Sequence, residues 1–220
     1  MDLVIIENEK KNLNLNSVLI QPTYFSTIAQ YVAIAKSNQI IFEVEDNYQK
    51  QTYRNRCYIN TANGKHLLNV PVQHQKGVKQ KTKDVKIDYK DNWQKQHLKS
   101  LKTAYSSSPF FEFYIDDLLP LFEKKVPFLL DLNLECHLLI MAALQLEIPY
   151  KKSENYIMET DFLDLRNLAI DKNKKTYKLE RYIQVFEQNH GFISNLSILD
   201  LLFMEGSNAL NYLENQNLIF

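Results

Sequence analysis

A basic stretch of the sequence, "NYQKQTYRNRCYINTANGKHLLNVPV" at residues 47–72, carries side chains well suited to binding an anion. Arg54 and Arg56 are two residues apart, so on a strand they face the same way. Lys50 lies just before them, and Asn55 points to the other face, where its amide can hydrogen-bond the backbone. Arginine makes bidentate contacts with phosphate and carboxylate groups. The partner of these arginines is therefore either an anionic ligand or the protein's own carboxylates.

Carboxylates gather just before this stretch, at the end of an expected strand over residues 39–46. Glu43, Glu45 and Asp46 lie at its carboxyl end, which is where ligands bind in α/β sheets. Such groups can act as a general base or as metal ligands, and Asp46 is our candidate for the general base. The same acids could instead pair with the arginines that follow, and ion pairs are the simpler interpretation.

The loop "QPTY" at residues 21–24 joins an expected strand at 17–22 to an expected helix at 25–38. A strand–loop–helix connection brings backbone N–H groups and the positive end of the helix dipole to one place, which suits an anion. Gln21 and Tyr24 are therefore candidate ligand-binding residues. The loop contains no glycine, and the four glycines of the chain form no phosphate-binding motif.

Trp93 and His97 are one helical turn apart in an expected helix that begins at residue 92, next to the basic region. We select His97 as a second candidate catalytic residue, and Tyr24 or Trp93 as a candidate for stacking on a ring of the ligand. The five histidines have no metal-binding spacing, and Cys57 and Cys136 lie far apart in apolar surroundings, as reduced buried thiols do. The sequence therefore predicts no metal site and leaves any cofactor open.

Charge is distributed unevenly along the chain. The 26 basic and 26 acidic residues cancel, which argues against a strongly basic nucleic-acid-binding protein. Residues 50–102, however, hold 13 lysines and arginines against 3 acids, and both flanking regions are acidic. This excess either pairs internally or forms a positive face for an anionic small molecule. We see no signal peptide and no membrane-spanning run, so we expect a cytoplasmic protein.

The pattern of apolar residues predicts one domain over residues 1–220, of the α/β (or α+β) class. A β-rich part, about 17–90, should hold a strand–helix–strand unit, a mixed sheet and a hairpin turned at Gly64, and a helical part should follow over about 92–216. The expected strands are 3–7, 17–22, 39–46, 56–61, 65–72 and 84–89. The expected helices are 25–38 (capped by Ser26 or Thr27), 92–107, 109–125 (broken near Pro120), 127–146 and two within 195–216 (capped by Asn195 and joined at Gly206). The segment 154–166 fits either a strand or a short helix.

Three blocks of the sequence, in this order, resemble the WbqC-like protein family of bacteria: "QPTYFSTIAQY", "NYQKQTYRNRCYINTANGKHLLNVPV" and "NWQKQHLKSLKTAYSSSPFFEFY". The resemblance covers most of residues 17–115, and the tail "HGFISNLSILDLLFMEG" is similar to a form of the family found in Bacteroidetes-like sequences. The family-defining positions correspond to Gln21, Pro22, Tyr24, Asp46, Lys50, Asn55, Arg56, Pro71, Trp93, Tyr105 and Pro109. Ser26 and Ala29 depart from the family's pattern, because many members have Pro and Gly there.

The resemblance implies a role in surface-polysaccharide and amino-sugar assembly. From it we expect transfer of an acyl or aminoacyl group to a nucleotide-linked amino sugar, with Lys50, Arg54 and Arg56 facing the diphosphate. One alternative is a nucleotide-binding or nucleotidyltransferase-like domain, although the His-x-x-His signature is missing. Another is a non-catalytic partner protein, for which the apolar run 198–203 would belong to an assembly surface such as that of a homodimer.

Overall fold

The computed structural model describes residues 17–73, 77, 79–170 and 177–220. Its central feature is a four-stranded sheet in the order β5-β2-β1-β6, in which every pair of neighbours is parallel. The strands are β1 (Val18–Ile20), β2 (Ile40–Phe42), β5 (Tyr150–Lys152) and β6 (Leu163–Asp164). The two central strands, β1 and β2, are apolar and fully buried, as strands covered on both faces are. The predicted α/β class is confirmed, with a parallel sheet in place of the expected mixed one.

The basic stretch folds into the predicted hairpin, which forms a sheet of its own. Strands β3 (Arg56–Thr61) and β4 (Gly64–Asn69) are antiparallel, and Thr61 lies opposite Gly64 at the turn. Gly64 has a φ of 90°, a conformation that glycine adopts without steric cost. The Thr61 hydroxyl donates to the Gly64 carbonyl oxygen at 2.8 Å and closes the turn.

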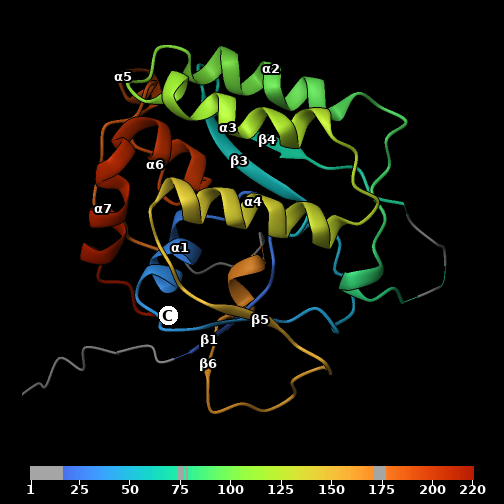
Figure 1. The fold of residues 1–220 in the computed structure, drawn as a ribbon. Coiled ribbons are helices and arrows are strands. Elements are labelled where there is room, and N and C mark those ends of the chain that lie inside the picture. Colours follow the sequence, from blue (N-terminus) through green and yellow to red (C-terminus); the bar gives the residue numbers. More distant parts are fainter. Residues whose placement is uncertain (1–16, 74–76, 78, 171–176) are drawn as a thin grey trace, which may run out of the picture.

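Helices pack against both sheets (Figure 1). They are α1 (Ile28–Ala35), α2 (Trp93–Tyr105), α3 (Phe111–Glu123), α4 (Leu129–Ala143), α5 (Glu187–His190), α6 (Ile198–Glu205) and α7 (Ala209–Asn215), with short 3-10 helices η1 (Thr82–Asp84), η2 (Arg166–Ala169) and η3 (Gly206–Asn208). Helices α2 and α3 lie side by side over the hairpin, and α4 runs between that layer and the parallel sheet (Figure 1). Helices α6 and α7 both pack against α1. Within the described part of the chain, no helix has the length and apolar character needed to cross a membrane.

Two expected elements differ from the structure, and one lies outside it. The segment 84–89 makes only isolated bridges, between Ile87 and Val72 and between Lys86 and Phe128, so it crosses neighbouring segments without forming a strand. Helix α3 continues past Pro120 to Glu123, because a proline in the last turn removes one backbone donor without ending the helix. The expected strand at 3–7 lies outside the described residues.

The predicted helix caps are confirmed at α1 and wrong at α6. Thr27 caps α1 and accepts a hydrogen bond from the Gln30 backbone N–H, as the sequence indicated. Helix α6 is capped by Ser197, two residues after the expected Asn195. The Asn195 side chain instead accepts from the Ala29 backbone N–H at 2.8 Å. Asn195 therefore joins the entry of α6 to the first turn of α1, a contact between residues far apart in the sequence.

The order of the parallel strands reverses at β1. Strands β2 and β5 extend the sheet on one side of β1, and β6, the last of the four along the chain, lies on the other. The carboxyl ends of β1 and β6 therefore border a topological switch point. In open parallel sheets, ligands bind in the crevice outside the strand ends at such a point.

Candidate functional site

A polar cavity of about 370 Å³ lies at the switch point, along the carboxyl edge of the parallel sheet. Gln21 follows β1 directly, Asp46 comes soon after β2, and Asp164 is the last residue of β6. The wall is formed by Gln21, Asp46, Gln49, Arg54, Tyr156, Asp164, Arg166, Asn167 and Ile170. Three of the predicted site residues, Gln21, Asp46 and Arg54, are brought together here.

Asp46 is the centre of the inner wall. Its Oδ2 oxygen accepts from Arg54 Nη2 at 2.6 Å and from Gln21 Nε2 at 3.0 Å. Its Oδ1 oxygen accepts from the hydroxyl of Thr82, in η1, at 2.5 Å. Both carboxylate oxygens are thus engaged within the protein. Of the two partners that the sequence allows for Arg54, the structure provides the internal carboxylate.

Arg166 forms a second ion pair in the cavity wall. Its Nε and Nη2 nitrogens donate to the Asp164 carboxylate at 2.9 and 2.6 Å, and Nη1 donates to the Ile157 carbonyl at 2.6 Å. Nη1 also lies 3.4 Å from Oε2 of Glu43, which is fully buried. Burial raises the pKa of Asp164, but the hydrogen bonds from Arg166 outweigh it and keep the pKa below its usual value. Asp164 is therefore ionised at neutral pH, and its side chain is 41% exposed.

The outer part of the cavity combines an aromatic ring with polar side chains. Tyr156 is 53% exposed, and the Arg166 guanidinium carbon lies 5.3 Å from the centre of its ring. Gln49 and Asn167 are exposed and add two amide groups to the wall. Amides offer both donors and acceptors, and an exposed tyrosine ring presents an apolar face with a polar tip. Such a lining is suited to a polar ligand with a ring.

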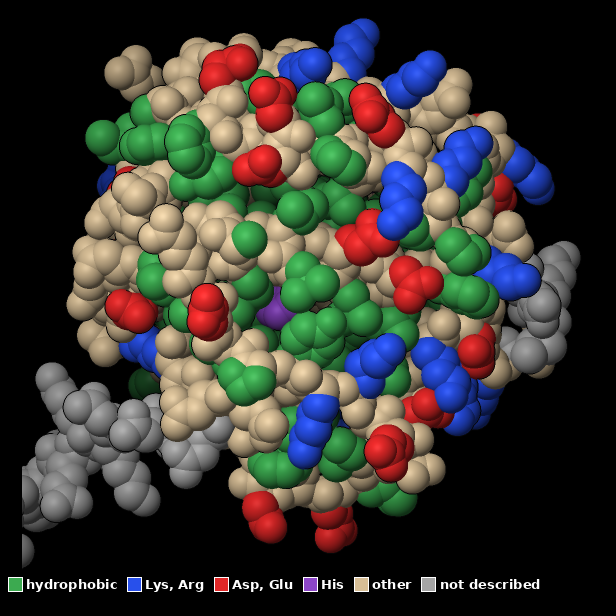
Figure 2. All heavy atoms as spheres, in the orientation of Figure 1, with side chains coloured by type: hydrophobic (Ala, Val, Ile, Leu, Met, Phe, Trp, Pro, Cys, Tyr) green, Lys and Arg blue, Asp and Glu red, His purple; other side chains and the backbone are tan. Residues whose placement is uncertain are grey.

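The basic region is largely neutralised near the cavity. Lys81 and Lys83 each lie 2.5 Å from the Glu45 carboxylate, and Arg54 pairs with Asp46. On the face drawn in Figure 2, lysines and arginines are interspersed with acids and do not form one positive region. The interpretation of internal ion pairs is confirmed for these residues. The cavity wall itself carries two arginines and two aspartates, so its charge is balanced.

Tyr24, Trp93 and His97, all predicted site residues, form a separate buried cluster. The Tyr24 hydroxyl lies 3.1 Å from His97 Nδ1, and the Trp93 ring meets His97 edge-on with centroids 5.1 Å apart. Burial lowers the pKa of His97 to about 4, against a hydrogen bond with the Asn69 backbone that favours the charged form. None of the three lines the cavity. In this structure the cluster packs the loop after β1 against α2.

The remaining predicted residues do not belong to the cavity wall. Asn55 Nδ2 donates to the Val70 carbonyl at 2.8 Å, the backbone contact that its position indicated. Arg54 lies in the turn before β3 and Arg56 is the first residue of that strand, so the two do not share one strand face. Arg56 is half-buried and Lys50 is exposed, and neither lines the cavity.

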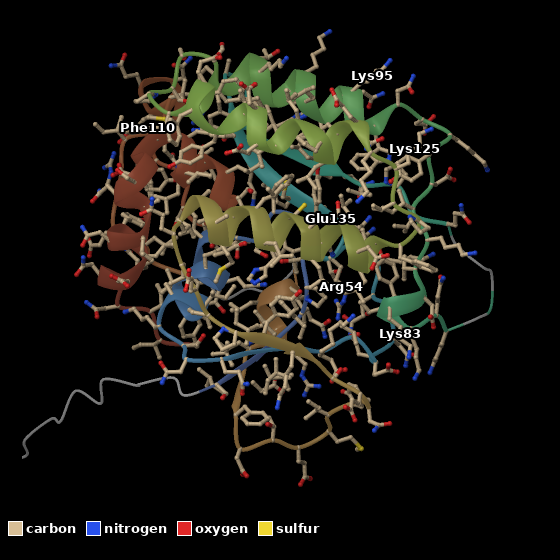
Figure 3. All side chains as sticks on the ribbon, viewed as in Figure 1. Arg54, Lys83, Lys95, Phe110, Lys125 and Glu135 are labelled. Carbon is tan, nitrogen blue, oxygen red and sulfur yellow. The ribbon has the colours of Figure 1, made fainter. Side chains whose placement is uncertain are left out.

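Helix α4 links two walls of the cavity through one side chain. Asn133 Nδ2 donates to the Pro22 carbonyl at 3.1 Å and to the Arg54 carbonyl at 2.8 Å. Asn133 is 1% exposed. Figure 3 shows Arg54 beneath α4, on the side where η1 carries Lys83. The loop after β1 and the turn before β3 are therefore held by the same amide group.

Sequence reasoning missed the half of the wall that comes from residues 154–170. A signal was present in "DFLDLRN", where the apolar Leu163 and Leu165 alternate with the charged Asp164 and Arg166. The assignment of 163–164 to the parallel sheet would have placed Asp164 and Arg166 at its carboxyl edge, where ligands bind. A strand of two residues has no measurable period, so the segment remained ambiguous between strand and helix.

Comparisons with known proteins agree with the sequence blocks described above. Residues 21–185 match the WbqC-like protein family. A Mycobacterium tuberculosis (strain ATCC 25618 / H37Rv) protein, "Uncharacterized protein Rv1507c", is 31% identical over 104 residues, which cover 47% of this chain and 45% of that protein. The chain thus matches less than half the length of this relative. No solved structure matches the chain. The family match includes every residue of the cavity wall and most of the chain, and the chain belongs to the WbqC-like protein family.

Proposed function

We propose that the protein binds a nucleotide-linked amino sugar in this cavity and transfers an acyl or aminoacyl group to its amine. The observation that carries the proposal is the position of a polar, charge-balanced cavity at the switch point of a parallel sheet. Carboxylates, guanidinium groups and amides offer donors and acceptors for the hydroxyl and amino groups of a sugar. The exposed ring of Tyr156 offers a surface for a sugar or base.

In this proposal Asp164 orients the attacking amine. Its carboxylate is ionised, accessible from the cavity and held by Arg166. The carboxylate accepts a hydrogen bond from the amine and takes its proton as the new N–C bond forms. The bond between the acyl carbon and its leaving group breaks, and the leaving group departs with the electron pair. Internal donors engage both oxygens of Asp46 and of Asp164, but the Asp46 side chain is only 10% exposed against 41% for Asp164, so Asp46, the candidate base from the sequence, is assigned a positioning role.

Binding measurements test the proposal directly. Thermal shift and calorimetry would compare UDP-glucosamine, which has a free amine, with UDP-glucose, which has a hydroxyl in its place. Ligand at one hundred times its Kd should raise the free energy of unfolding by about 2.7 kcal/mol. Asp164→Asn should weaken the binding of UDP-glucosamine about tenfold and that of UDP-glucose by less than about threefold, because only the amine gains from the charge.

A matched control lies in the same connection of the chain. Asp161 is exposed, and it does not line the cavity. Asp161→Asn should leave both affinities unchanged. An equal loss for the two nucleotide sugars in Asp164→Asn would remove Asp164 from its proposed role. Absence of binding by either nucleotide sugar to the folded protein would reject the proposed substrate class.

The order of the strands supports a second candidate, a nucleotide-binding or nucleotidyltransferase-like function. Numbered along the chain, the four parallel strands lie in the order third, second, first, fourth. This is the order of the first four strands in doubly wound dinucleotide-binding folds, in which the ligand lies at the reversal. The same screen should include ATP with Mg²⁺. A shift with ATP and Mg²⁺ and none with nucleotide sugars would favour this function over acyl transfer.

A further inference from the structure

Two polar atoms of the inner wall have no hydrogen-bond partner among the described residues: Oε1 of Gln21 and Nε of Arg54. Gln21 is 2% exposed and Arg54 is 3% exposed. Buried polar groups in native proteins are nearly always hydrogen-bonded, and exceptions are often tied to function. Other buried polar atoms, such as Nε1 of Trp93 and Oδ1 of Asn133, also lack a partner among the described residues, but these two belong to side chains that line the same cavity. A ligand bound there is one way to complete their hydrogen bonds.

The contact with Asp46 determines which atoms of Gln21 and Arg54 remain without a hydrogen-bond partner. A carboxylate oxygen accepts hydrogen bonds, so the Gln21 amide must turn its nitrogen toward Oδ2 and its oxygen away. Arg54 uses Nη2 for the same oxygen. In each side chain, one carbon atom separates the free atom from the nitrogen that contacts Oδ2. The inner wall therefore offers one acceptor and one donor close to a single carboxylate oxygen.

We propose that this inner wall binds the sugar end of the ligand, through a neutral group that both donates and accepts, and that the phosphates lie outside it. The inference rests on the proposed function for the kind of ligand. A hydroxyl or a secondary amide of a sugar can donate to Gln21 Oε1 and accept from Arg54 Nε. The oxygens of a nucleotide diphosphate are acceptors and cannot satisfy Gln21. They would also lie beside the Asp46 carboxylate, which already balances the charge of Arg54.

The arginine side chains provide a direct test in the unmodified protein. The chain has only four arginines, Arg54, Arg56, Arg166 and Arg181, so an NMR spectrum of their Nε–H groups should contain four signals. Lysine variants at the other three positions identify the Arg54 signal by elimination. We expect UDP-N-acetylglucosamine or UDP-glucose to shift the Arg54 signal, and UDP alone or inorganic phosphate to leave it in place.

The choice of probe separates the two neutral groups. A larger Arg54 shift with UDP-N-acetylglucosamine indicates the amide, and equal shifts with both nucleotide sugars indicate a hydroxyl that the two share. Both results support a sugar at the inner wall. A shift of the Arg54 signal with UDP alone or with inorganic phosphate would overturn the proposal, because it would place phosphate at the inner wall.

A substitution at Gln21 provides an independent measurement. Gln21→Met keeps the length of the side chain and removes both the acceptor Oε1 and the Nε2–H donor to Asp46. It should weaken binding of the preferred nucleotide sugar about tenfold and leave binding of UDP alone unchanged, because UDP does not reach the inner wall in this proposal. Gln96→Met, at an exposed amide on α2, is the control and should change neither affinity. Thermal unfolding of each variant shows that it is folded. An equal loss for UDP and for the nucleotide sugar in Gln21→Met would contradict the proposal.

The same experiments separate this inference from the proposed function. Nucleotide sugars that bind Gln21→Met as tightly as the unmodified protein would reject the inference and leave the function in place. Free N-acetylglucosamine that shifts the Arg54 signal, in a protein that binds no nucleotide sugar, would support the inference and reject the function. No response of the Arg54 signal to any of these probes would reject the inference, and absence of nucleotide-sugar binding to the unmodified protein by calorimetry would reject the function as well.

Discussion

Asp46 and Arg54 illustrate how one buried ion pair organises the site. Arg54 is 3% exposed, and its guanidinium contacts the Asp46 carboxylate at 2.6 Å. Gln21, just after β1, and Thr82, in η1, donate further hydrogen bonds to the same carboxylate. A buried charge is costly unless it is paired and hydrogen-bonded, so each of these residues depends on the others. Three segments of the chain therefore meet at one carboxylate.

The first prediction concerns this pair. Arg54→Met should lower the free energy of unfolding by about 3 kcal/mol, because it leaves the Asp46 charge buried without its cation. The measurement is urea unfolding followed by circular dichroism. Arg181→Met is the control, since Arg181 is 69% exposed and its ion pair with Glu187 should be worth less than about 1 kcal/mol. Equal losses in the two variants would mean that the Asp46–Arg54 pair has no special role in stability.

At the scale of single residues, the sequence indicated which side chains lie at strand ends, but not which side chains they contact in the fold. Gln21, Asp46 and Arg54 were found because they flank apolar strands, where ligand-binding side chains collect. The pairing of Arg54 could not be predicted, because it depends on the turn that places Arg54 before β3 and not within it. Tyr24 and Trp93 were selected for chemistry that their rings could perform, but both are buried in the cluster with His97.

At the scale of elements, long apolar patterns were predicted well and short ones poorly. The hairpin and the helices over 93–143 were recognised, because their periods extend over many residues. The strand β6 has two residues and exists only because it pairs with β1. The segment 84–89 has strand-like composition but meets only single residues of other segments. Pairing with distant segments, and not local composition, explains why residues 163–164 form a strand and residues 84–89 do not.

The second prediction concerns the junction between α6 and α7. Gly206 has a φ of 55°, and a Cβ atom there would lie 2.5 Å from the ring of Phe110. Phe110 precedes α3, lies near α6 (Figure 3), and donates its backbone N–H to the Phe203 carbonyl at 3.1 Å. Gly206→Ala should therefore combine backbone strain with a steric clash. Thermal or urea unfolding measures the loss of stability.

A variant at Gly191 separates the cost of backbone strain from the cost of the steric clash. Gly191 also has a positive φ, 78°, but nothing lies within 4 Å of a Cβ atom placed there. Gly191→Ala should cost about 1–3 kcal/mol from backbone strain alone, because its φ of 78° and ψ of −177° lie in a region that essentially only glycine adopts. Gly206→Ala should cost roughly 1–3 kcal/mol more, from overpacking against Phe110. Similar losses in both variants would show that Phe110 moves aside freely.

At the scale of the whole molecule, the site depends on an order of strands that no local pattern records. Gln21, Asp46 and Asp164 are separated by long stretches of chain and meet because the sheet places β6 beside β1. The sequence supported the α/β class and the location of ligands at strand ends. The sequence could not show which strands are neighbours in the sheet, because strand pairing is set by contacts between distant segments. For this reason the wall from residues 154–170 was not predicted.

The third prediction concerns stability as a function of pH. Burial lowers the pKa of both His97 and His137 to about 4, below the ordinary value of 6.5. Between these pH values the unfolded chain binds more protons than the folded one, so stability is lost as the pH falls from 6.5 toward 4. Each histidine should cost roughly 2 kcal/mol between pH 7 and pH 5. Urea unfolding at the two pH values measures the change.

A histidine variant isolates this effect from other titrating groups. Asp200 is fully buried, and burial raises its pKa, so its protonation acts in the opposite direction as the pH falls. His137→Phe should remove about half of the histidine contribution and leave that of Asp200 in place. An unchanged difference in stability between pH 7 and pH 5 in this variant would mean that His137 is already accessible to protons in the folded state.

The double hydrogen bond of Asn133 has a consequence for the kinetics of recognition. Because one amide of α4 holds both the loop after β1 and the turn before β3, these two walls are already in place before a ligand arrives. Binding to a preorganised surface loses little conformational entropy, since few groups are ordered on contact. Differences in affinity among related ligands should then appear mainly in how slowly each one dissociates.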